Sequence, residues 1–452
     1  MPSWVREHLS LSPLLGLCLS VLLLVPAASH GADAMKVLLK AEGFVSGDGG
    51  APPEGWSAWS PRAEIAPSLG VDPKGGRSGR GALTLKGGGN PSAHGAWRRE
   101  VKGVQPGRSY RFSAWFRTHD IPSPQQHVGM EMDWLDASGE RARPPDFALA
   151  ARREGAWSLM EYETTAPEGA ASVRLGLSLS WAPKGTLWWD GVEVAEAPAR
   201  EGRVVRAVTV YTRPKGSGSA EESVRQFCAL LDGATTLKPD IVCLPEGITV
   251  VGTSKSYAEV SEPLKGPTAR SLGEVARKLN AYIVAGIYER DGGTVYNTAI
   301  LIDRQGRLAG SYRKTHLPRE EVEGGITPGS GYPVFKTDFG TVGLLICWDL
   351  QFPEPWRALA LKGAEVVLLP IWGGTEVLAH ARAIENHLFI VTSSYDMRSF
   401  ILDPVGSILC EATEKQPLAV AELRLDRKIL QPWLGDMKTR TWRERRPDLA
   451  TP

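Results

Sequence analysis

The sequence predicts an all-β sandwich followed by a layered α/β domain. Between residues 35 and 196, short apolar runs alternate with polar residues at a period of two, and Gly and Pro separate the runs. This pattern is typical of the strands of a β-sandwich. From residue 203 onward, apolar strand patterns alternate with helical patterns. Such alternation indicates an α/β fold whose Val-, Ile- and Leu-rich strands are buried.

The predicted strands of the first half share the period-two pattern, and no helical stretch competes with them. They are residues 81–88, 96–101, 109–118, 128–136, 171–180 and 186–194. Residues 195–202 (AEAPAREG) contain Pro, Gly and small residues, so we interpret them as part of a linker. We therefore expect a sandwich domain over residues 35–198.

The second half repeats a strand–helix plan. The predicted strands are residues 204–211, 240–246, 281–289, 295–303, 341–347, 365–371 and 389–395. The predicted helices are residues 220–234, 269–280, 356–364 and 381–388. We expect one α/β domain over residues 203–449.

Charge and cysteine content exclude several classes of protein. The 52 basic and 51 acidic residues leave a net charge of +1, which gives no support to a nucleic-acid-binding or membrane-surface protein. The 5 Cys residues are too few for a disulfide framework, although a Cys228–Cys243 bridge stays open. No CxxC or HExxH spacing supports a zinc site.

The N-terminal segment has the order of a secretory signal peptide. Arg6 precedes the apolar run Leu14–Val25, and small residues follow in PAASHGADA. Twelve residues are too few to cross a bilayer, which takes about 20. Cleavage after Ser29, Gly31 or Ala34 fits, and Ala34 ends an A-x-A site. We expect residues 1–34 to be removed and the protein to be exported to the periplasm or outside the cell; an uncleaved anchor is the alternative.

Three polar side chains stand where predicted strands end. Glu246 follows the strand in IVCLPEG, Lys314 lies in SYRKTHLPREE, and Cys347 ends the strand in VGLLICWDLQFPE. Strand ends are where α/β folds place functional groups. Taken singly, each side chain has an ordinary explanation: a buried Cys, a solvated loop carboxylate and a surface Lys.

Together and in this order, the three segments resemble the Glu, Lys and Cys segments of the nitrilase superfamily of carbon–nitrogen hydrolases. Further matching segments are YNTA at 296–299, ITPG at 326–329, FPE at 352–354, KGAEVVLLP at 362–370 and RAIEN at 382–386. The resemblance covers nearly all of residues 203–449. It implies a four-layer α-β-β-α sandwich, an amidase-type hydrolase and a dimer or larger homo-oligomer.

The implied chemistry is physically consistent. A thiolate is the nucleophile, and a free thiol with a pKa near 8.5 is mostly protonated at neutral pH. Glu246 can take the proton from Cys347 and later pass it to the leaving nitrogen. Lys314 and the backbone N–H of Trp348 are natural donors to the oxyanion that forms on the attacked carbonyl. Water then releases the acid from the thioester, and no metal or organic cofactor is required.

Supporting residues follow from the same resemblance. Many relatives carry a Glu shortly after the Lys segment, and Glu321 matches that place best, with Glu320 and Glu323 as close alternatives. This Glu would hold Lys314 and the substrate amide; a solvated loop carboxylate is the other interpretation. Asn297 is expected to brace the Glu and Lys loops. We expect His316 to pack structurally, Asp349 to fix the turn after the nucleophile, and Arg382 to pair with Glu385.

The substrate stays open at this stage. Relatives that hydrolyse N-carbamoyl amino acids present an Arg a few residues after the Cys, whereas Trp348, Asp349, Leu350 and Gln351 stand there in this chain. A neutral or basic amide or an N-carbamoyl amine therefore fits as well as an acidic substrate. A nitrile hydrolase would use the same three groups. A catalytically inactive glycan-binding protein of the cell envelope is the alternative from another class.

The first half resembles the jelly-roll, galactose-binding-like modules found beside exported carbohydrate enzymes. The stretches that carry this resemblance include GALTLKG, QPGRSYRFSAWFR and TLWWDGVEV. Two interpretations stand side by side. Either exposed Trp59, Trp97 or Trp134 stacks on a glycan, or these rings fill the sandwich core. In modules of this kind Asp190 would stand beside a structural calcium.

Overall fold

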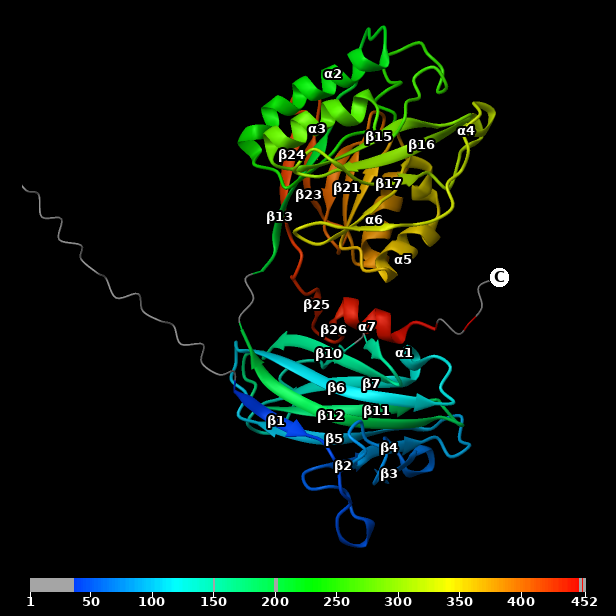
Figure 1. The fold of residues 1–452 in the computed structure, drawn as a ribbon. Helices are drawn as coiled ribbons and strands as arrows, with labels where there is room; N and C mark the ends of the chain where they lie inside the picture. Colours follow the sequence, from blue (N-terminus) through cyan, green and yellow to red (C-terminus); the bar gives the residue numbers. More distant parts are fainter. Residues whose placement is uncertain (1–35, 149–150, 199–201, 447–448, 450–452) are drawn as a thin grey trace, which may run out of the picture.

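The computed structural model describes residues 36–148, 151–198, 202–446 and 449. Its strands and helices form an all-β part below and an α/β part above, with a C-terminal segment between them (Figure 1). This arrangement confirms the predicted fold class. The predicted signal peptide, residues 1–34, lies outside the described residues, and so do residues 199–201 of the predicted linker. The domain limits 35–198 and 203–449 therefore stay a proposal.

The all-β part consists of two antiparallel sheets packed face to face. One sheet has the order β3-β4-β12-β6-β10-β9 with β1 paired to β12, and the other has the order β2-β5-β11-β7-β8. Their bounds are β1 Val37–Ala41, β2 Ser57–Trp59, β3 Ser68–Asp72, β4 Ala82–Lys86, β5 His94–Lys102, β6 Ser109–His119, β7 Val128–Leu135, β8 Asp146–Ala148, β9 Ala151–Glu154, β10 Trp157–Thr165, β11 Ser172–Ser180 and β12 Thr186–Ala197. A short helix, α1 (Pro124–His127), precedes β7.

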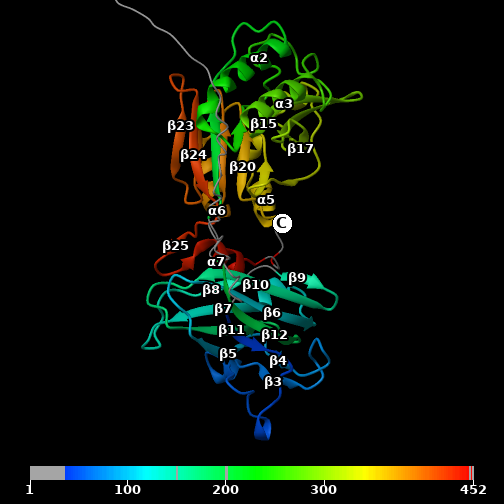
Figure 2. The ribbon, with the colours of Figure 1, turned by 60° about the vertical axis from the view of Figure 1, so that its left-hand side comes forward.

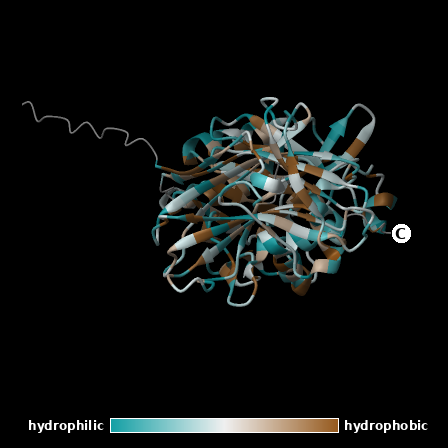
Figure 3. Ribbon diagram, turned by 90° about the horizontal axis from the view of Figure 1, so that it is seen from below, coloured by the Kyte–Doolittle hydropathy of each residue, from teal (hydrophilic) through white to brown (hydrophobic). Residues whose placement is uncertain are grey.

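Side-chain alternation explains why these segments form a sandwich. In β6, Tyr110, Phe112, Ala114 and Phe116 are buried, and the residues between them are partly exposed. Hydrophobic and hydrophilic residues alternate in the same way along other strands of this part (Figure 3). Because successive strand residues point to opposite faces, one face of each sheet supplies the core.

Two of the three Trp residues considered for glycan stacking belong to the core. Trp97 is 2% exposed and Trp134 is 0% exposed, which confirms for these two rings the interpretation that they fill the sandwich core and rules out stacking on a glycan. The Trp134 indole N–H instead donates to Asp146 Oδ2 at 3.0 Å. Trp59 is partly exposed, and its ring is covered by the Arg98 guanidinium at 3.6 Å.

Asp190 is buried beneath a loop and is bound by backbone donors. Its Oδ2 accepts the Arg77 N–H at 2.8 Å and its Oδ1 accepts the Gly43 N–H at 3.3 Å. Among the described residues there is no group of three or more His, Cys, Asp or Glu side chains that could hold a metal ion. In this structure Asp190 therefore fastens two loops to the sheet.

The α/β part contains two six-stranded sheets packed face to face. Their orders are β17-β16-β15-β14-β13-β24 and β18-β19-β20-β21-β22-β23. The strands of the first sheet are β13 Val204–Val210, β14 Ile241–Cys243, β15 Tyr282–Asp291, β16 Thr294–Ile302, β17 Leu308–Arg313 and β24 Leu418–Arg424. Those of the second are β18 Val334–Lys336, β19 Thr341–Leu344, β20 Val366–Pro370, β21 Phe389–Ser393, β22 Ser399–Leu402 and β23 Ile408–Ala412.

Helices cover the outer faces of both sheets and complete the four layers (Figure 1). Helices α2 (Ala220–Leu231) and α3 (Pro267–Leu279) share a core cluster with the first sheet, and α5 (Pro353–Leu361) and α6 (Glu376–Asn386) share one with the second. In α2, Val224, Phe227 and Leu231 are buried at the spacing of one helix face. Ser219 caps this helix by accepting the Glu222 N–H at 3.3 Å.

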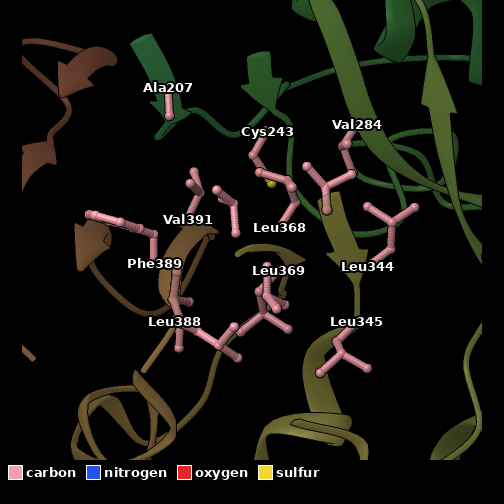
Figure 4. Packing of buried hydrophobic residues seen from close by; sticks show 14 of the residues in the cluster. Ala207, Cys243, Val284, Leu344, Leu345, Leu368, Leu369, Leu388, Phe389 and Val391 are labelled. Carbon is pink, nitrogen blue, oxygen red and sulfur yellow. The ribbon is translucent and has the colours of Figure 1, made fainter. Parts of the chain in front are cut away.

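The main core lies between the two sheets. Ala207, Cys243 and Val284 come from the first sheet and face Leu368 and Val391 of the second (Figure 4). Cys228, Cys243, Cys347 and Cys410 are free thiols in this structure, so the Cys228–Cys243 bridge that the sequence left open is not formed. Among the described residues, no helix has the length and apolarity that a membrane crossing requires.

The C-terminal segment returns from the α/β part to the sandwich. It comprises β25 (Leu430–Gln431), β26 (Gly435–Asp436) and α7 (Met437–Glu444), which lie against the sandwich in both ribbon views (Figure 2). Just before it, Lys428 Nζ lies 3.0 Å from Asp146 Oδ1 and 2.6 Å from Thr164 Oγ1. A charged contact therefore joins the two parts.

Asp146 is the buried centre of this contact, and we expect Asp146→Asn to destabilise the protein by about 2–4 kcal/mol. The carboxylate is 0% exposed and bonds Lys428, Arg143, Thr164 and Trp134. The amide would leave two cations near the core without a counter-charge. Urea unfolding followed by Trp fluorescence measures the loss. Asp232→Asn is the control, because its pair with Lys278 is more than half exposed and should contribute little.

Candidate active site

Glu246 lies in the loop after β14, and its carboxylate is 3% exposed. Its Oε1 accepts Asn297 Nδ2 at 2.7 Å and Lys314 Nζ at 2.9 Å, and its Oε2 accepts the Trp372 N–H at 2.9 Å. The loop passes close to β15: a Cβ on Gly286 would stand 2.7 Å from the Glu246 Cα. Only glycine fits there, so the close contact with β15 fixes the position of the Glu246 backbone and its carboxylate.

Lys314 directly follows β17 and is 1% exposed. Its Nζ lies 2.9 Å from Glu246 Oε1 and 3.0 Å from Glu321 Oε1. Burial alone would lower the pKa of Lys314, but the negative charges of Glu246 and Glu321 outweigh it and raise that pKa. Lys314 is therefore an ammonium throughout the physiological pH range.

Glu321 stands in the short helix α4 (Arg319–Glu323) and is 4% exposed. Burial raises the pKa of its carboxyl group, while Lys314 acts in the opposite direction. Asn297, from β16, donates to Glu321 Oε1 at 2.6 Å and to Glu246 Oε1 at 2.7 Å. Asn297 thus bridges the two carboxylates that flank Lys314, as expected for a brace, and Glu321 is not a solvated loop residue.

Cys347 follows the strand β19 by two residues and opens a 3-10 turn, Cys347–Gln351. Its φ of 42° lies in the left-handed region, which is strained for a residue with a Cβ. Its Sγ lies 3.7 Å from the Gly373 carbonyl oxygen. Burial, followed by the negative charge of Glu246, raises the pKa of the Cys347 thiol to about 12, although Lys314 lowers it.

The raised pKa predicts that Cys347 is a neutral thiol in the resting protein. Because a raised pKa keeps the proton on sulfur as the pH rises, no thiolate should form between pH 6 and 9. The absorbance of wild type minus Cys347→Ala at 240 nm should therefore show no thiolate band in this range. Burial also raises the pKa of the other described thiols, and the difference spectrum cancels them. A difference band that appears between pH 6 and 9, around the ordinary thiol pKa of about 8.5, contradicts this prediction.

Asp349 ties the lysine loop to the turn that carries Cys347. Its 0%-exposed carboxylate accepts the Ile346 N–H at 2.9 Å, the Tyr312 hydroxyl at 2.8 Å and the His316 N–H at 3.2 Å. The His316 ring lies 2.8 Å from the same carboxylate through Nδ1 and stacks on Phe352 at 4.1 Å. His316 and Asp349 are therefore structural, as the sequence indicates.

Arg382 lies 2.9 Å from Glu385, the predicted partner, and also donates to the carbonyl groups of Leu350 and Gln351. It thus holds the end of the turn after Cys347. Trp348 stands at the start of that turn with a side chain 40% exposed, and this side chain does not line the cavity described below.

A cavity of about 560 Å³ unites the predicted residues. Glu246, Lys314, Glu321 and Cys347 line it, and so does Glu320, the alternative to Glu321. Other lining residues were missed in the sequence: Arg213, Tyr257, Tyr288 and Trp372. The rings of Tyr257 and Tyr288 stack at 4.5 Å. Trp372 follows the strand β20, so its place at a strand end was a usable signal. Tyr257 lies in a loop and offers no such signal.

Comparison with known proteins agrees with this geometry. Residues 207–430 match the family described as carbon-nitrogen hydrolase. A deaminated glutathione amidase of Synechocystis is 33% identical over 252 residues, which cover 49% of this chain and 91% of that protein. The chain belongs to the carbon–nitrogen hydrolase family. It is an amidase-type member of the nitrilase superfamily, and an inactive glycan-binding protein is thereby set aside.

Other relatives of this hydrolase match the same half of the chain. The omega-amidase of Homo sapiens is 29% identical over 235 residues, which cover 46% of this chain and 85% of that protein. The crystal structure of a carbon-nitrogen hydrolase from Helicobacter pylori G27 covers 55% of this chain and 97% of its own, at 25% identity and a TM-score of 0.46. The family match begins at residue 207, so the β-sandwich lies outside it.

Proposed function

We propose that this carbon–nitrogen hydrolase cleaves small non-peptide amides with Cys347 as nucleophile, Glu246 as proton shuttle and Lys314 as oxyanion donor. One observation carries the proposal: a buried ammonium between two buried carboxylates, in the same cavity as a thiol on a strained turn. Burying such charges costs free energy, so the arrangement serves chemistry better than it serves stability.

The proposed reaction runs in two halves. As Cys347 Sγ attacks the amide carbon, its proton passes to Glu246, and the negative charge gathers on the carbonyl oxygen. Lys314 and the backbone N–H of Trp348 stabilise that charge. Glu246 then gives the proton to the leaving nitrogen, the C–N bond breaks, and ammonia or an amine departs. Glu246 next takes a proton from water, whose oxygen attacks the thioester carbon, and returns it to sulfur as the acid leaves.

One oxygen of Glu321 has room for a further hydrogen bond, which supports a role in substrate binding. Its Oε2 is buried and ion-paired with Lys314 Nζ at 3.0 Å, and it accepts no hydrogen bond from the other described residues. A carboxylate oxygen can accept more than one hydrogen bond. We propose that an N–H of the substrate amide donates to this oxygen. Glu321 would then orient the amide plane toward Cys347.

The names of the relatives guide the proposed substrate class. A deaminated glutathione amidase and an omega-amidase match this chain, so we propose a terminal carboxamide on a small molecule. The cavity contains one further cation, Arg213, and its charge is already paired with Asp396 at 2.6 Å. No Arg follows Cys347 closely. We therefore favour a neutral amide substrate over an acidic one. N-carbamoyl amines and nitriles are the alternative substrates for the assay below.

Trapping the acyl-enzyme tests the mechanism and the substrate class together. The purified protein is mixed with terminal carboxamides, N-carbamoyl amines and nitriles, ammonia is measured, and the reaction is quenched with acid for peptide mass spectrometry. We expect ammonia from carboxamides and an acyl group on the Cys347 peptide. The proposed nucleophile is overturned if the acyl group is found only on Cys410, or if ammonia is released and no cysteine carries an acyl group. Ammonia from nitriles alone overturns the substrate class.

We also propose export, a homo-oligomer and a glycan partner for the sandwich. Export is supported by the Arg6 and Leu14–Val25 pattern, and a mature chain that still begins at Met1 on N-terminal sequencing refutes it.

Oligomer formation is supported by exposed apolar residues on α5 and α6, where Leu361 is 48%, Val377 67% and Ile384 50% exposed. Light scattering that gives the mass of one chain refutes it.

A further inference from the structure

A second cavity, of about 570 Å³, lies between the sandwich and the C-terminal segment. Gln126 and His127 of α1 and Trp181 after β11 line one side. The other side is lined by Arg443, Glu444, Arg445 and Arg446, and the carboxylate of Glu444 is paired with Arg440 at 2.9 Å. None of these residues lines the cavity of Cys347. The chain thus has a hollow, far along the sequence from the amidase residues, where aromatic and cationic groups meet.

Trp181 presents a flat apolar ring that burial does not explain. Its side chain is 55% exposed, and its φ is 54°, in the region that a bulky residue avoids. The backbone N–H of Trp181 donates to the Ala93 carbonyl at 2.6 Å. The Trp181 ring stacks on the His94 ring at 6.3 Å between centroids. The backbone therefore holds this ring outward at a cost in conformational energy. Such cost at an exposed aromatic residue points to contact with a ligand.

Arg443 supplies a positive charge without a close counter-charge. Among the described residues it makes no hydrogen bond and no ion pair, and its guanidinium lies 5.1 Å from the centroid of the Phe147 ring. Its guanidinium packs on β7 so closely that a Cβ on Gly129 would stand 2.3 Å from its Nη1. Burial lowers the pKa of Arg443, and only the more distant Glu131 and Glu444 oppose this. An anion in the cavity would complete the hydrogen bonding of this guanidinium.

Gln126 adds an amide to the same wall. Its side chain is 7% exposed, and its Oε1 makes no hydrogen bond among the described residues. A hydroxyl group both donates and accepts, so it suits either end of an amide. His127 stands beside it, fixed through Nδ1 at 2.8 Å from the Ser180 carbonyl oxygen.

We propose that this cavity binds an acidic saccharide, with one sugar face on Trp181, its carboxylate on Arg443 and a hydroxyl on Gln126. The ring of Trp181, the charge of Arg443 and the amide of Gln126 together select the ligand class. An inorganic anion has no apolar face for the ring, and a neutral sugar leaves the arginine charge unpaired. The C–H face, hydroxyls and carboxylate of a uronic acid meet all three. This cavity would be the place where the sandwich binds its proposed glycan partner. The proposal does not depend on the amidase mechanism.

Titration calorimetry on the full-length mature protein tests the site. The probes are tetragalacturonic acid, tetramannuronic acid and the methyl ester of each, which keeps the sugar and removes the charge. We expect binding of at least one acid, with its ester bound at least about 10-fold more weakly. Trp181→Ala and Arg443→Gln should each weaken binding of that acid at least about 10-fold.

Matched variants separate the possible outcomes. Trp433→Ala is the control for Trp181→Ala, because Trp433 is 87% exposed and does not line the cavity. Ammonia release should be unchanged in Trp181→Ala, so a failure here is distinct from a failure of the amidase proposal. The proposal is overturned if neither acid binds, if acid and ester bind equally, or if Trp181→Ala binds like wild type. Since Arg443 is packed against Gly129, Arg445→Gln provides a second removal of charge from the same cavity, and wild-type binding by both arginine variants also overturns the proposal.

Discussion

Cys347→Ala is expected to lower kcat for ammonia release roughly 10⁴-fold or more, because no other group can form the covalent intermediate. Substrate binding should persist, since Glu321 and Lys314 remain in place. Steady-state ammonia assays measure the rate, and calorimetry with a substrate amide measures the binding. The midpoint of thermal unfolding should change little, because the substitution removes only one sulfur atom.

Cys410→Ala is the matched control for this substitution. Cys410 is a partly buried free thiol on β23, outside the cavity of Cys347. Its replacement should leave kcat within about twofold of wild type. Equal ammonia release by wild type and Cys347→Ala would falsify the proposed nucleophile, and a joint loss in both variants would point to a general effect on folding instead.

Lys314→Met is expected to lower kcat/KM roughly 10²–10³-fold, the usual effect of removing one oxyanion donor. It should also change the pH profile. In the wild type the ammonium lies between Glu246 and Glu321. Without it, two buried carboxylates face each other, and the pKa of one of them must rise. A base whose pKa is raised loses its proton only at higher pH, so the acid limb of kcat/KM should move to higher pH.

Lys278→Met is the control for Lys314→Met, because the Lys278 pair with Asp232 is exposed and neither residue lines the cavity of Cys347. We expect an unchanged pH profile for it. The proposal for Lys314 fails if Lys314→Met keeps both its rate and its acid limb. A lower rate with an unshifted acid limb would retain an oxyanion role but reject the electrostatic coupling to the two carboxylates.

Local chemistry made much of the site predictable from sequence. Glu246, Lys314 and Cys347 each follow a strand, which is where α/β folds place functional groups. Glu246 and Lys314 follow strands of one sheet and Cys347 follows a strand of the other, so the packing of the two sheets brings them together. Asn297 and Glu321 were predicted from the resemblance, and both contact Lys314 or its partner. The order of β13, β14 and β15 in one sheet could not be read from periodicity. It depends on hydrogen bonds between distant segments.

The Trp residues show where sequence reasoning reached its limit. In β12, Trp188 and Trp189 are neighbours, yet Trp189 is 0% exposed and Trp188 is partly exposed. Register decides which ring enters the core, and a shift of one residue would exchange them. Trp97 and Trp134 are buried for the same reason, whereas Trp181, which the sequence did not single out, stands at a strand end and faces the second cavity.

By itself, the sequence determined the two-part fold class, many of the strands and helices, and the family to which the α/β part belongs. These follow from periodicity and from ordered local segments, which each stretch of chain carries within itself. Only the tertiary structure decided which residues complete the cavity of Cys347, how deeply the thiol is buried beside Glu246, and that Arg443 and Trp181 line one cavity. Burial and charge pairing arise when distant segments pack together, and they set the pKa values and the open contacts.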